Sequence, residues 1–140
     1  MAGFIYSETQ VEIFRFLERV GPCPTPALAI IFGKRVQKHL FRLRKQGYIY
    51  NLTLNEIEFW IPQHYGHFNP RLQEVMAWFA VRLIEAGGTI NGKVGVSPNG
   101  AVMLLSPARD RIIIDSDGRK FEALLVDLRT KRMKECLKAV

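Results

Sequence analysis

The stretch GKRVQKHLFRLRKQG, residues 33–47, predicts the fold of the first half of this chain. It holds six of the chain's 20 Lys and Arg residues and no acidic residue. Val36, Leu40 and Leu43 are spaced i, i+4 and i+7, so they share one stripe of a helix. A second, basic stripe lies roughly opposite, with Lys34 beside it: Arg35, Lys38, Arg42 and Lys45. We therefore predict a helix over residues 34–46 with one buried and one cationic face.

The cationic face of this helix indicates a partner. Like charges at i, i+4 spacing destabilise a helix by about 0.2–0.5 kcal/mol for each pair. A face that only keeps a helix in water usually mixes Glu with Lys, because opposite charges at this spacing attract. The unmixed face favours a polyanion, with nucleic acid as the first choice. The alternative is an ordinary solvated surface.

Composition supports the same class of partner. The 140 residues are 48% hydrophobic, which suffices for a real core and fits one domain or two very small ones. The formal net charge is +7 and the pI about 9.7, which favours nucleic acid or an anionic surface. No apolar run approaches the roughly 18 residues of a membrane span, and MAGFIYSETQ lacks the pattern of a signal peptide. We expect an intracellular, cytoplasmic protein with no membrane partner.

Two helices are predicted before the basic helix, and a β-hairpin after it. SETQVEIFRFLERVG, residues 7–21, begins with Ser and Gln at the positions of a capping box and ends in Gly. PTPALAIIFG, residues 24–33, offers Thr25 as the cap of a short, largely buried helix. YIYNLTLNEIEFWIP, residues 48–62, is rich in aromatic and β-branched residues and predicts two strands around a turn at residues 53–55.

This order of elements over residues 7–62 resembles the winged helix-turn-helix family of DNA-binding domains. The most specific part is VQKHLFRLRKQGYIY, in which the basic helix runs through Gly47 and Tyr48 into the hairpin. In that family the third helix enters the major groove, the first two helices brace it, and the hairpin forms a wing beside the phosphate backbone. The turn before the basic helix is a few residues shorter than usual. The resemblance implies a winged helix-turn-helix domain over residues 1–62.

Six side chains are candidates for DNA contact: Lys34, Arg35, Gln37, Lys38, Arg42 and Lys45. Arg35, Gln37 and Lys38 lie at the N-terminal end of the helix, which reads base edges in such domains. Arg and Lys match guanine, and Gln matches adenine. Arg42 and Lys45 lie further along and are expected to contact phosphates. The predicted wing tip, TLNE, has no Lys or Arg, so a winged-helix module that binds another protein is an open alternative.

A linker is predicted at residues 63–69. His64 and His67 in this segment have a ligand-like spacing, but a stable zinc site needs three or four ligands, so no metal or cofactor is expected. Cys23 and Cys136 also lack partners at metal-ligand spacing and are expected to be reduced thiols, unless the source is a hyperthermophile.

Residues 70–140 are predicted to form a small α-ββββ-α domain, which makes the fold class α+β. Helical spacing of apolar residues covers residues 70–86. Four strands and a basic terminal helix follow, at residues 93–96, 101–105, 111–115 and 120–128 and from Thr130 onward. Whether this half senses a ligand, dimerises or is a degenerate nuclease stays open.

Acidic residues in the second half raise an enzymatic alternative. IIIDSDG followed by FEALLVDLRTKRMKECLKAV resembles the C-terminal part of the replication-relaxation family, which joins a PDDEXK-type nuclease-like domain to a winged helix. Carboxylates such as those of Asp115 and Asp127 could hold Mg²⁺ for phosphodiester cleavage. Leu125 stands where the pattern of that family implies an acid, and the lysine of the nuclease pattern is missing from FEALLV. We therefore assign no catalytic residue and expect no enzyme activity; the acids could equally lie in turns and at strand ends.

The sequence thus predicts a sequence-specific double-stranded DNA-binding protein, most simply a transcriptional regulator. Replication or DNA processing and protein interaction are the alternatives. The chain is also similar to small winged-helix proteins of plasmids and archaeal viruses. We expect a homodimer, because two recognition helices read two half-sites about one helical turn apart. The helix over residues 70–86 is expected at the interface, since Met76, Trp78 and Phe79 are typical interface anchors. The alternative is that this helix is buried between the two halves of one chain.

Overall fold

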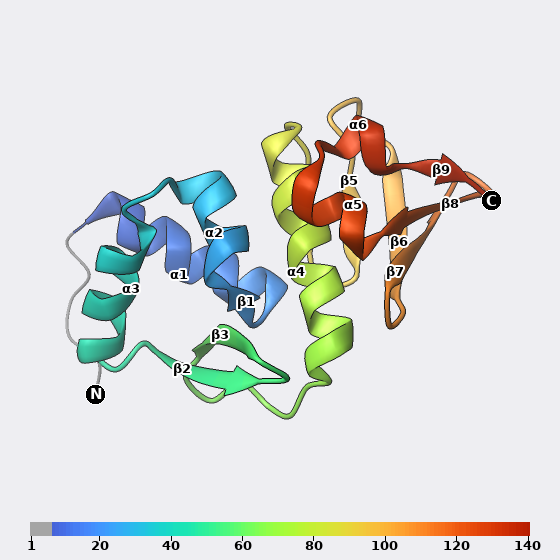
Figure 1. Cartoon of the computed structure of the whole chain (residues 1–140). Coiled ribbons are helices and arrows are strands. Elements are labelled where there is room, and N and C mark those ends of the chain that lie inside the picture. The colour runs from blue at the N-terminus through green and yellow to red at the C-terminus, as the bar shows by residue number, and fades with distance from the viewer. Residues whose placement is uncertain (1–6) are drawn as a thin grey trace.

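The computed structural model of the chain describes residues 7–140 and shows two antiparallel sheets and several helices (Figure 1). The predicted α+β class is confirmed, while residues 1–6 of the predicted first domain lie outside the described residues. The first half contains α1 (Glu8–Val20), β1 (Cys23–Pro24), α2 (Thr25–Phe32), α3 (Val36–Lys45), β2 (Ile49–Leu54) and β3 (Ile57–Pro62). The second half contains α4 (Pro70–Glu85), β4 (Thr89–Asn91), β5 (Val94–Val96), β6 (Val102–Pro107), β7 (Arg111–Ser116), β8 (Arg119–Leu124), α5 (Leu125–Thr130), α6 (Met133–Cys136) and β9 (Lys138–Ala139).

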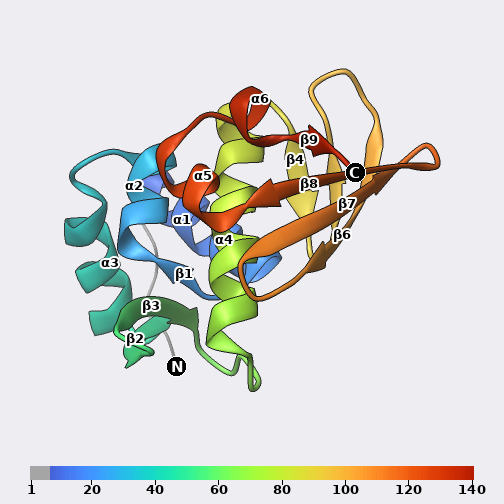
Figure 2. The same cartoon turned by 45° about the vertical axis from the view of Figure 1, so that its right-hand side comes forward.

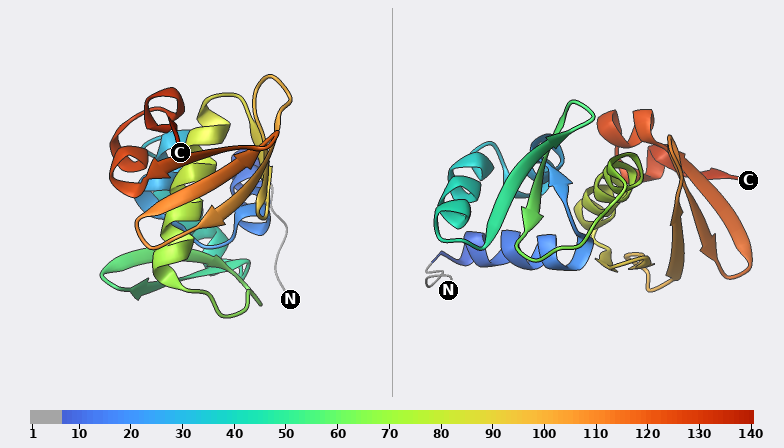
Figure 3. Two further views of the ribbon diagram at one scale, coloured as in Figure 1. Left: turned by 90° about the vertical axis from the view of Figure 1, so that its right-hand side faces the viewer. Right: turned by 90° about the horizontal axis from the view of Figure 1, so that it is seen from below.

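The two sheets belong to different halves of the chain. The three-stranded sheet has the order β1-β3-β2, and the six-stranded sheet is a meander from β4 to β9 in chain order. Figure 3 shows α4 lying between the first-half elements and the six-stranded sheet. Buried apolar side chains from both halves form one continuous core around this helix.

Local sequence signals explain the bounds of α1 and α3. Ser7 caps α1 as predicted, because its Oγ accepts a hydrogen bond of 3.4 Å from the backbone N–H of Gln10. The apolar stripe of α3 is buried as predicted. The chain leaves α3 through Gly47, whose φ of +84° suits glycine, and the N–H of Tyr48 donates to the carbonyl of Leu43. These ends turn the chain directly from α3 into β2.

Two details of the first half differ from the prediction. Thr25 is the first residue of α2 and not its cap; its hydroxyl instead accepts from Trp60 Nε1 at 2.8 Å and donates to Glu58 Oε1 at 3.0 Å. The hairpin turn consists of Asn55 and Glu56, one to two residues later than predicted. Both have positive φ, which suits the tight two-residue turns that match the twist of a hairpin.

Helix α4 is buried on nearly every side within one chain. All residues from Gln73 to Leu83 are buried, and Trp78 is only 6% exposed. A helix that is buried on all sides belongs inside a core, because no face is left for solvent; its buried polar side chains Glu74 and Arg82 form ion pairs with Arg129 and Glu85. The prediction that this helix forms a dimer interface is therefore wrong: α1, α2 and β1 cover one side, and α5 and the six-stranded sheet cover the other.

The end of the second half differs most from the prediction. The strand expected over residues 120–128 ends at Leu124, and α5 begins there because Leu125 and Leu128 can both be buried at helical spacing. The expected terminal helix is the single turn α6, followed by β9. Neither β4 nor β9 was predicted, so the sheet has six strands and not four.

Two further predictions concern the state of the cysteines and the presence of a membrane-spanning segment. Cys23 and Cys136 are free thiols, as expected, and burial raises the pKa of both. Among the helices of residues 7–140, none has the length and apolar character that crossing a membrane requires.

Candidate nucleic-acid interface

The predicted DNA-binding residues gather on the outward side of α3. Figure 2 shows α3 at one end of the molecule, with the six-stranded sheet at the other. All six candidates are exposed: Lys34, Arg35, Gln37, Lys38, Arg42 and Lys45. The five cations among them form no salt bridge within residues 7–140. The face is thus a cluster of like charges that no acidic side chain of residues 7–140 pairs with.

The N-terminal end of this face is a short turn. Helix α3 begins at Val36, so Lys34 and Arg35 precede it, two residues later than the predicted start. Arg35 occupies the N-cap position and supplies no side-chain cap. The positive end of the helix dipole therefore adds to the charges of Lys34 and Arg35. Such an end can bind a phosphate oxygen or another anion.

Arg44 differs from the other cations of α3 because it joins the helix to the hairpin. Its Nη1 donates to Asn51 Oδ1 at 2.9 Å. Its guanidinium carbon lies 5.0 Å from the ring centroid of Phe41 and 5.8 Å from that of Trp60. The sequence offers one signal for this role, since Arg44 follows Leu40 by four residues and so borders the buried stripe.

A chain of hydrogen bonds extends this link across the hairpin. Asn51 Nδ2 on β2 donates to Glu58 Oε2 on β3 at 3.2 Å. The other carboxylate oxygen of Glu58 accepts from Thr25 at the start of α2. The chain therefore connects α3, both hairpin strands and α2, and it holds the hairpin at a defined place beside α3.

His39 lies on the opposite border of α3, toward α1. Burial, followed by the charges of Arg42 and Lys38, lowers the pKa of His39. A neutral ring can accept a hydrogen bond at Nδ1, which lies 3.3 Å from Nε2 of the buried Gln10. The Gln10 side chain thus braces α3 against α1 instead of completing the predicted capping box.

Positive charge from the second half lies beside the hairpin tip. Arg71, in the first turn of α4, and Arg109, in the β6–β7 turn, line a shallow hollow of about 560 Å³ together with Asn55. Both arginines are exposed. Sequence reasoning missed them because they are distant in the chain from the hairpin and no local pattern connects them.

The acids and histidines considered for metal binding are scattered. Asp110 and Glu122 both pair with Arg111, and hydrogen bonding from Arg111 lowers the pKa of Asp110. Asp127 lies on α5, where a strand was expected, and pairs with Lys131 and Lys138. His64 and His67 are exposed in the segment before α4, and Asp115 and Asp117 lie on β7 and in the turn after it. Across the described part of the chain, no three His, Cys, Asp or Glu side chains gather as a metal site would require.

The candidate interface consists of the exposed side of α3 and the hairpin beside it. Comparisons with protein-family models, with curated proteins and with solved structures found no match to this chain.

Proposed function

We propose that the protein is a sequence-specific double-stranded DNA-binding protein that acts inside the cell as a transcriptional regulator. Residues 7–62 form its winged helix-turn-helix, in which α3 lies in the major groove and β2 and β3 form the wing. The observation that carries this proposal is the exposed face of α3, where five cations have no acidic partner among the described residues. Phosphates would neutralise these charges and release counterions.

The side chains of α3 divide by position. Arg35, Gln37 and Lys38 lie at or near its N-terminus and would contact base edges. Arg42 and Lys45 lie one to three turns further on and would contact phosphates. The link from Arg44 to Asn51 supports this arrangement, because it keeps the wing beside α3 without using any of these five side chains.

The wing would obtain its phosphate contacts from the second half. Its strands and turn carry no Lys or Arg, but Arg71 and Arg109 lie beside its tip. Together with Asn55, they offer hydrogen-bond donors to a phosphate. Replacing both arginines with Ala would reduce affinity for all duplexes and leave base preference unchanged.

We further propose a homodimer, formed through the outer face of the six-stranded sheet. Val94, Val102 and Leu104 are 43%, 54% and 56% exposed on this face, and Val94 is the cross-strand neighbour of Leu104. Figure 3 shows α4 on the other side of the sheet. A second copy of the chain would cover this apolar face, and opposite charges on Asp115 and Lys120, which are paired across β7 and β8, could meet their counterparts around a two-fold axis.

The test of DNA binding is fluorescence anisotropy with random and genomic duplexes over a range of salt concentrations. One variant replaces Arg35, Lys38, Arg42 and Lys45 with Ala. It should lose most of its affinity, and the slope of log affinity against log salt should fall by about 1.8, which is about 0.9 for each of the two phosphate contacts made by Arg42 and Lys45. The control replaces four exposed cations outside the proposed DNA and dimer interfaces with Ala: Lys93, Arg119, Arg132 and Lys134. Equal affinity of both variants for duplex DNA would refute the proposal.

The test of the dimer is light scattering at micromolar concentration. The wild type should show twice the 16.0 kDa of the chain. Leu104→Lys should give a folded monomer, because it places a charge in the apolar face and leaves the core unchanged. A monomeric wild type would refute the homodimer without affecting the DNA-binding proposal.

A further inference from the structure

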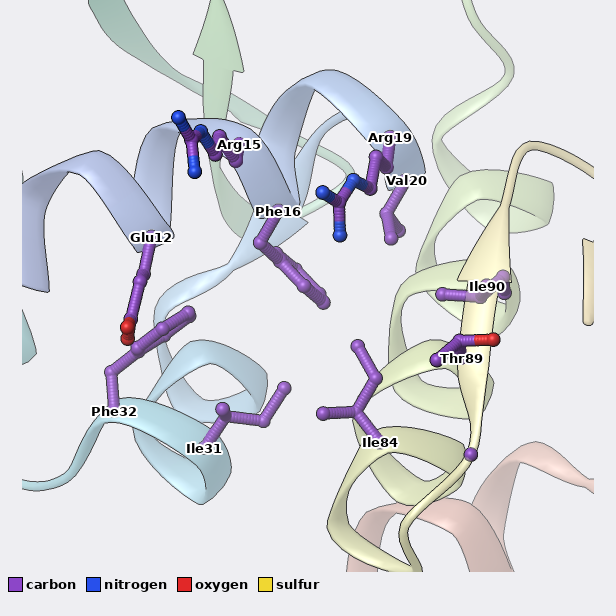
Figure 4. Close-up of a pocket in the computed structure, with 11 residues that line it drawn as sticks. Glu12, Arg15, Phe16, Arg19, Val20, Ile31, Phe32, Ile84, Thr89 and Ile90 are labelled. Carbon is purple, nitrogen blue, oxygen red and sulfur yellow. The ribbon is translucent and has the colours of Figure 1, made fainter. Parts of the chain in front are cut away.

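A pocket of about 310 Å³ lies where the two halves of the chain meet (Figure 4). Its volume is at the lower end of the range of small-molecule sites, about 300–1,000 Å³. Helices α1 and α2 form one wall, and α4 with β4 forms the other. The apolar lining comes from both halves: Phe16, Val20, Ile31, Phe32, Ile84 and Ile90. Such a lining would receive the apolar body of a ligand.

The polar groups of the pocket are not balanced in charge. Arg15, Arg19 and Glu12 all lie on its α1 wall. Figure 4 shows the guanidinium of Arg19 at the rim beside the ring of Phe16, while the carboxylate of Glu12 lies near Phe32. None of these three side chains has an ion-pair partner within the described range 7–140. Arg19 therefore offers a fork of N–H donors next to an apolar surface.

We propose that this pocket binds a small organic anion that has an apolar chain and one carboxylate. The apolar chain packs against Phe16, Ile31 and Ile84, and the carboxylate accepts hydrogen bonds from Arg19. Arginine suits this role because its planar donor fork matches both oxygens of a carboxylate. A neutral ligand would leave Arg19 without a partner. A cationic ligand would be repelled by Arg15 and Arg19, which outnumber the one acid of the pocket, Glu12 near Phe32. The inference does not depend on DNA binding.

The experiment is isothermal titration calorimetry of the full chain with three probes of equal length: octanoate, octanamide and octylamine. Octanoate should bind most tightly. Arg19→Gln should weaken octanoate about tenfold, as expected for the loss of one charge-assisted hydrogen bond, and leave octanamide unchanged. Arg19 is exposed on α1, so this substitution leaves the core intact. The matched control Arg119→Gln removes an equal charge far from the pocket and should change nothing.

A second variant tests the location of the site. Ile31→Trp adds volume to the wall formed by α2, and it should abolish the binding of octanoate and octanamide alike, with an unchanged circular dichroism spectrum. Equal affinity for octanoate and octylamine, no binding of octanoate, or wild-type binding of octanoate by Arg19→Gln would each overturn the proposal.

Discussion

Replacing Gln73 with Leu should destabilise both halves of the chain together. Gln73 lies on α4, and its Nε2 donates to the carbonyl of Val20 at 3.1 Å and to that of Pro22 at 2.8 Å. These carbonyls belong to the turn between α1 and β1, where Gly21 has a φ of +95°. A Cβ at Gly21 would lie 3.0 Å from the amide nitrogen of Gln73. The side chain of Gln73 therefore fits closely against the first half.

The magnitude follows from these two hydrogen bonds. A buried polar group that loses its partner costs about 1–3 kcal/mol. Two carbonyls would lose their partner, and the Leu side chain would recover a little apolar burial. We expect the free energy of unfolding to fall by about 2–4 kcal/mol, a large part of the roughly 5–15 kcal/mol that holds a typical domain folded.

The assay is urea unfolding, followed by tryptophan fluorescence and by far-UV circular dichroism. Because the core is continuous through both halves, the two signals should give one coincident transition in the wild type and in the variant. The midpoint of this transition should lie at a lower urea concentration in the variant. Gln37→Leu is the matched control, since Gln37 is exposed on α3. A change below about 0.5 kcal/mol for Gln73→Leu would refute this reasoning, because that is the size of an ordinary surface effect. Two separate transitions would show that α4 does not join the halves into one unit.

The remaining predictions concern DNA contact, pH, the core and catalysis. Arg35→Ala should relax base preference at one position of the target at a cost of about 1–3 kcal/mol, whereas Lys45→Ala should weaken all duplexes alike and reduce the salt slope by about 1, as measured by anisotropy. The lowered pKa of His39 means that the unfolded chain binds more protons than the folded chain below about pH 6.5. The free energy of unfolding should therefore fall as the pH drops below about 6.5, and His39→Gln should remove this part of the slope in urea titrations. Trp78→Glu should lose about 3–5 kcal/mol and with it cooperative thermal unfolding, because the side chain is 6% exposed in the core; a folded variant would contradict this burial. Supercoiled, linear and single-stranded DNA should stay intact on incubation with the protein in Mg²⁺ or Mn²⁺, and cleavage abolished by Asp115→Asn would contradict this prediction.

Local patterns in the sequence determined the elements that depend on near neighbours. The stripe of Val36, Leu40 and Leu43 predicts α3 and its exposed cationic side, because helical periodicity decides which side chains share a face. Ser7 predicts the start of α1 for a similar reason, since a cap acts within its own turn. Periodicity and turn residues also predicted α4 and the strands β5, β6 and β7. The predicted ends of these four elements lie within two residues of the observed ends.

The tertiary structure alone decided which surfaces are covered and which distant residues meet. Trp78 is of a residue type that often anchors interfaces, but the first-half helices and the six-stranded sheet cover the helix that carries it from both sides. Short strands such as β1 and β9 exist only because β3 and β8 offer them hydrogen bonds, and two residues carry no detectable period. Arg44 and Arg42 look alike in the sequence, yet the position of Asn51 gives only Arg44 a partner. The pocket beside Arg19 likewise requires walls from both halves, because residues distant in the chain form a cavity only when the core brings them together.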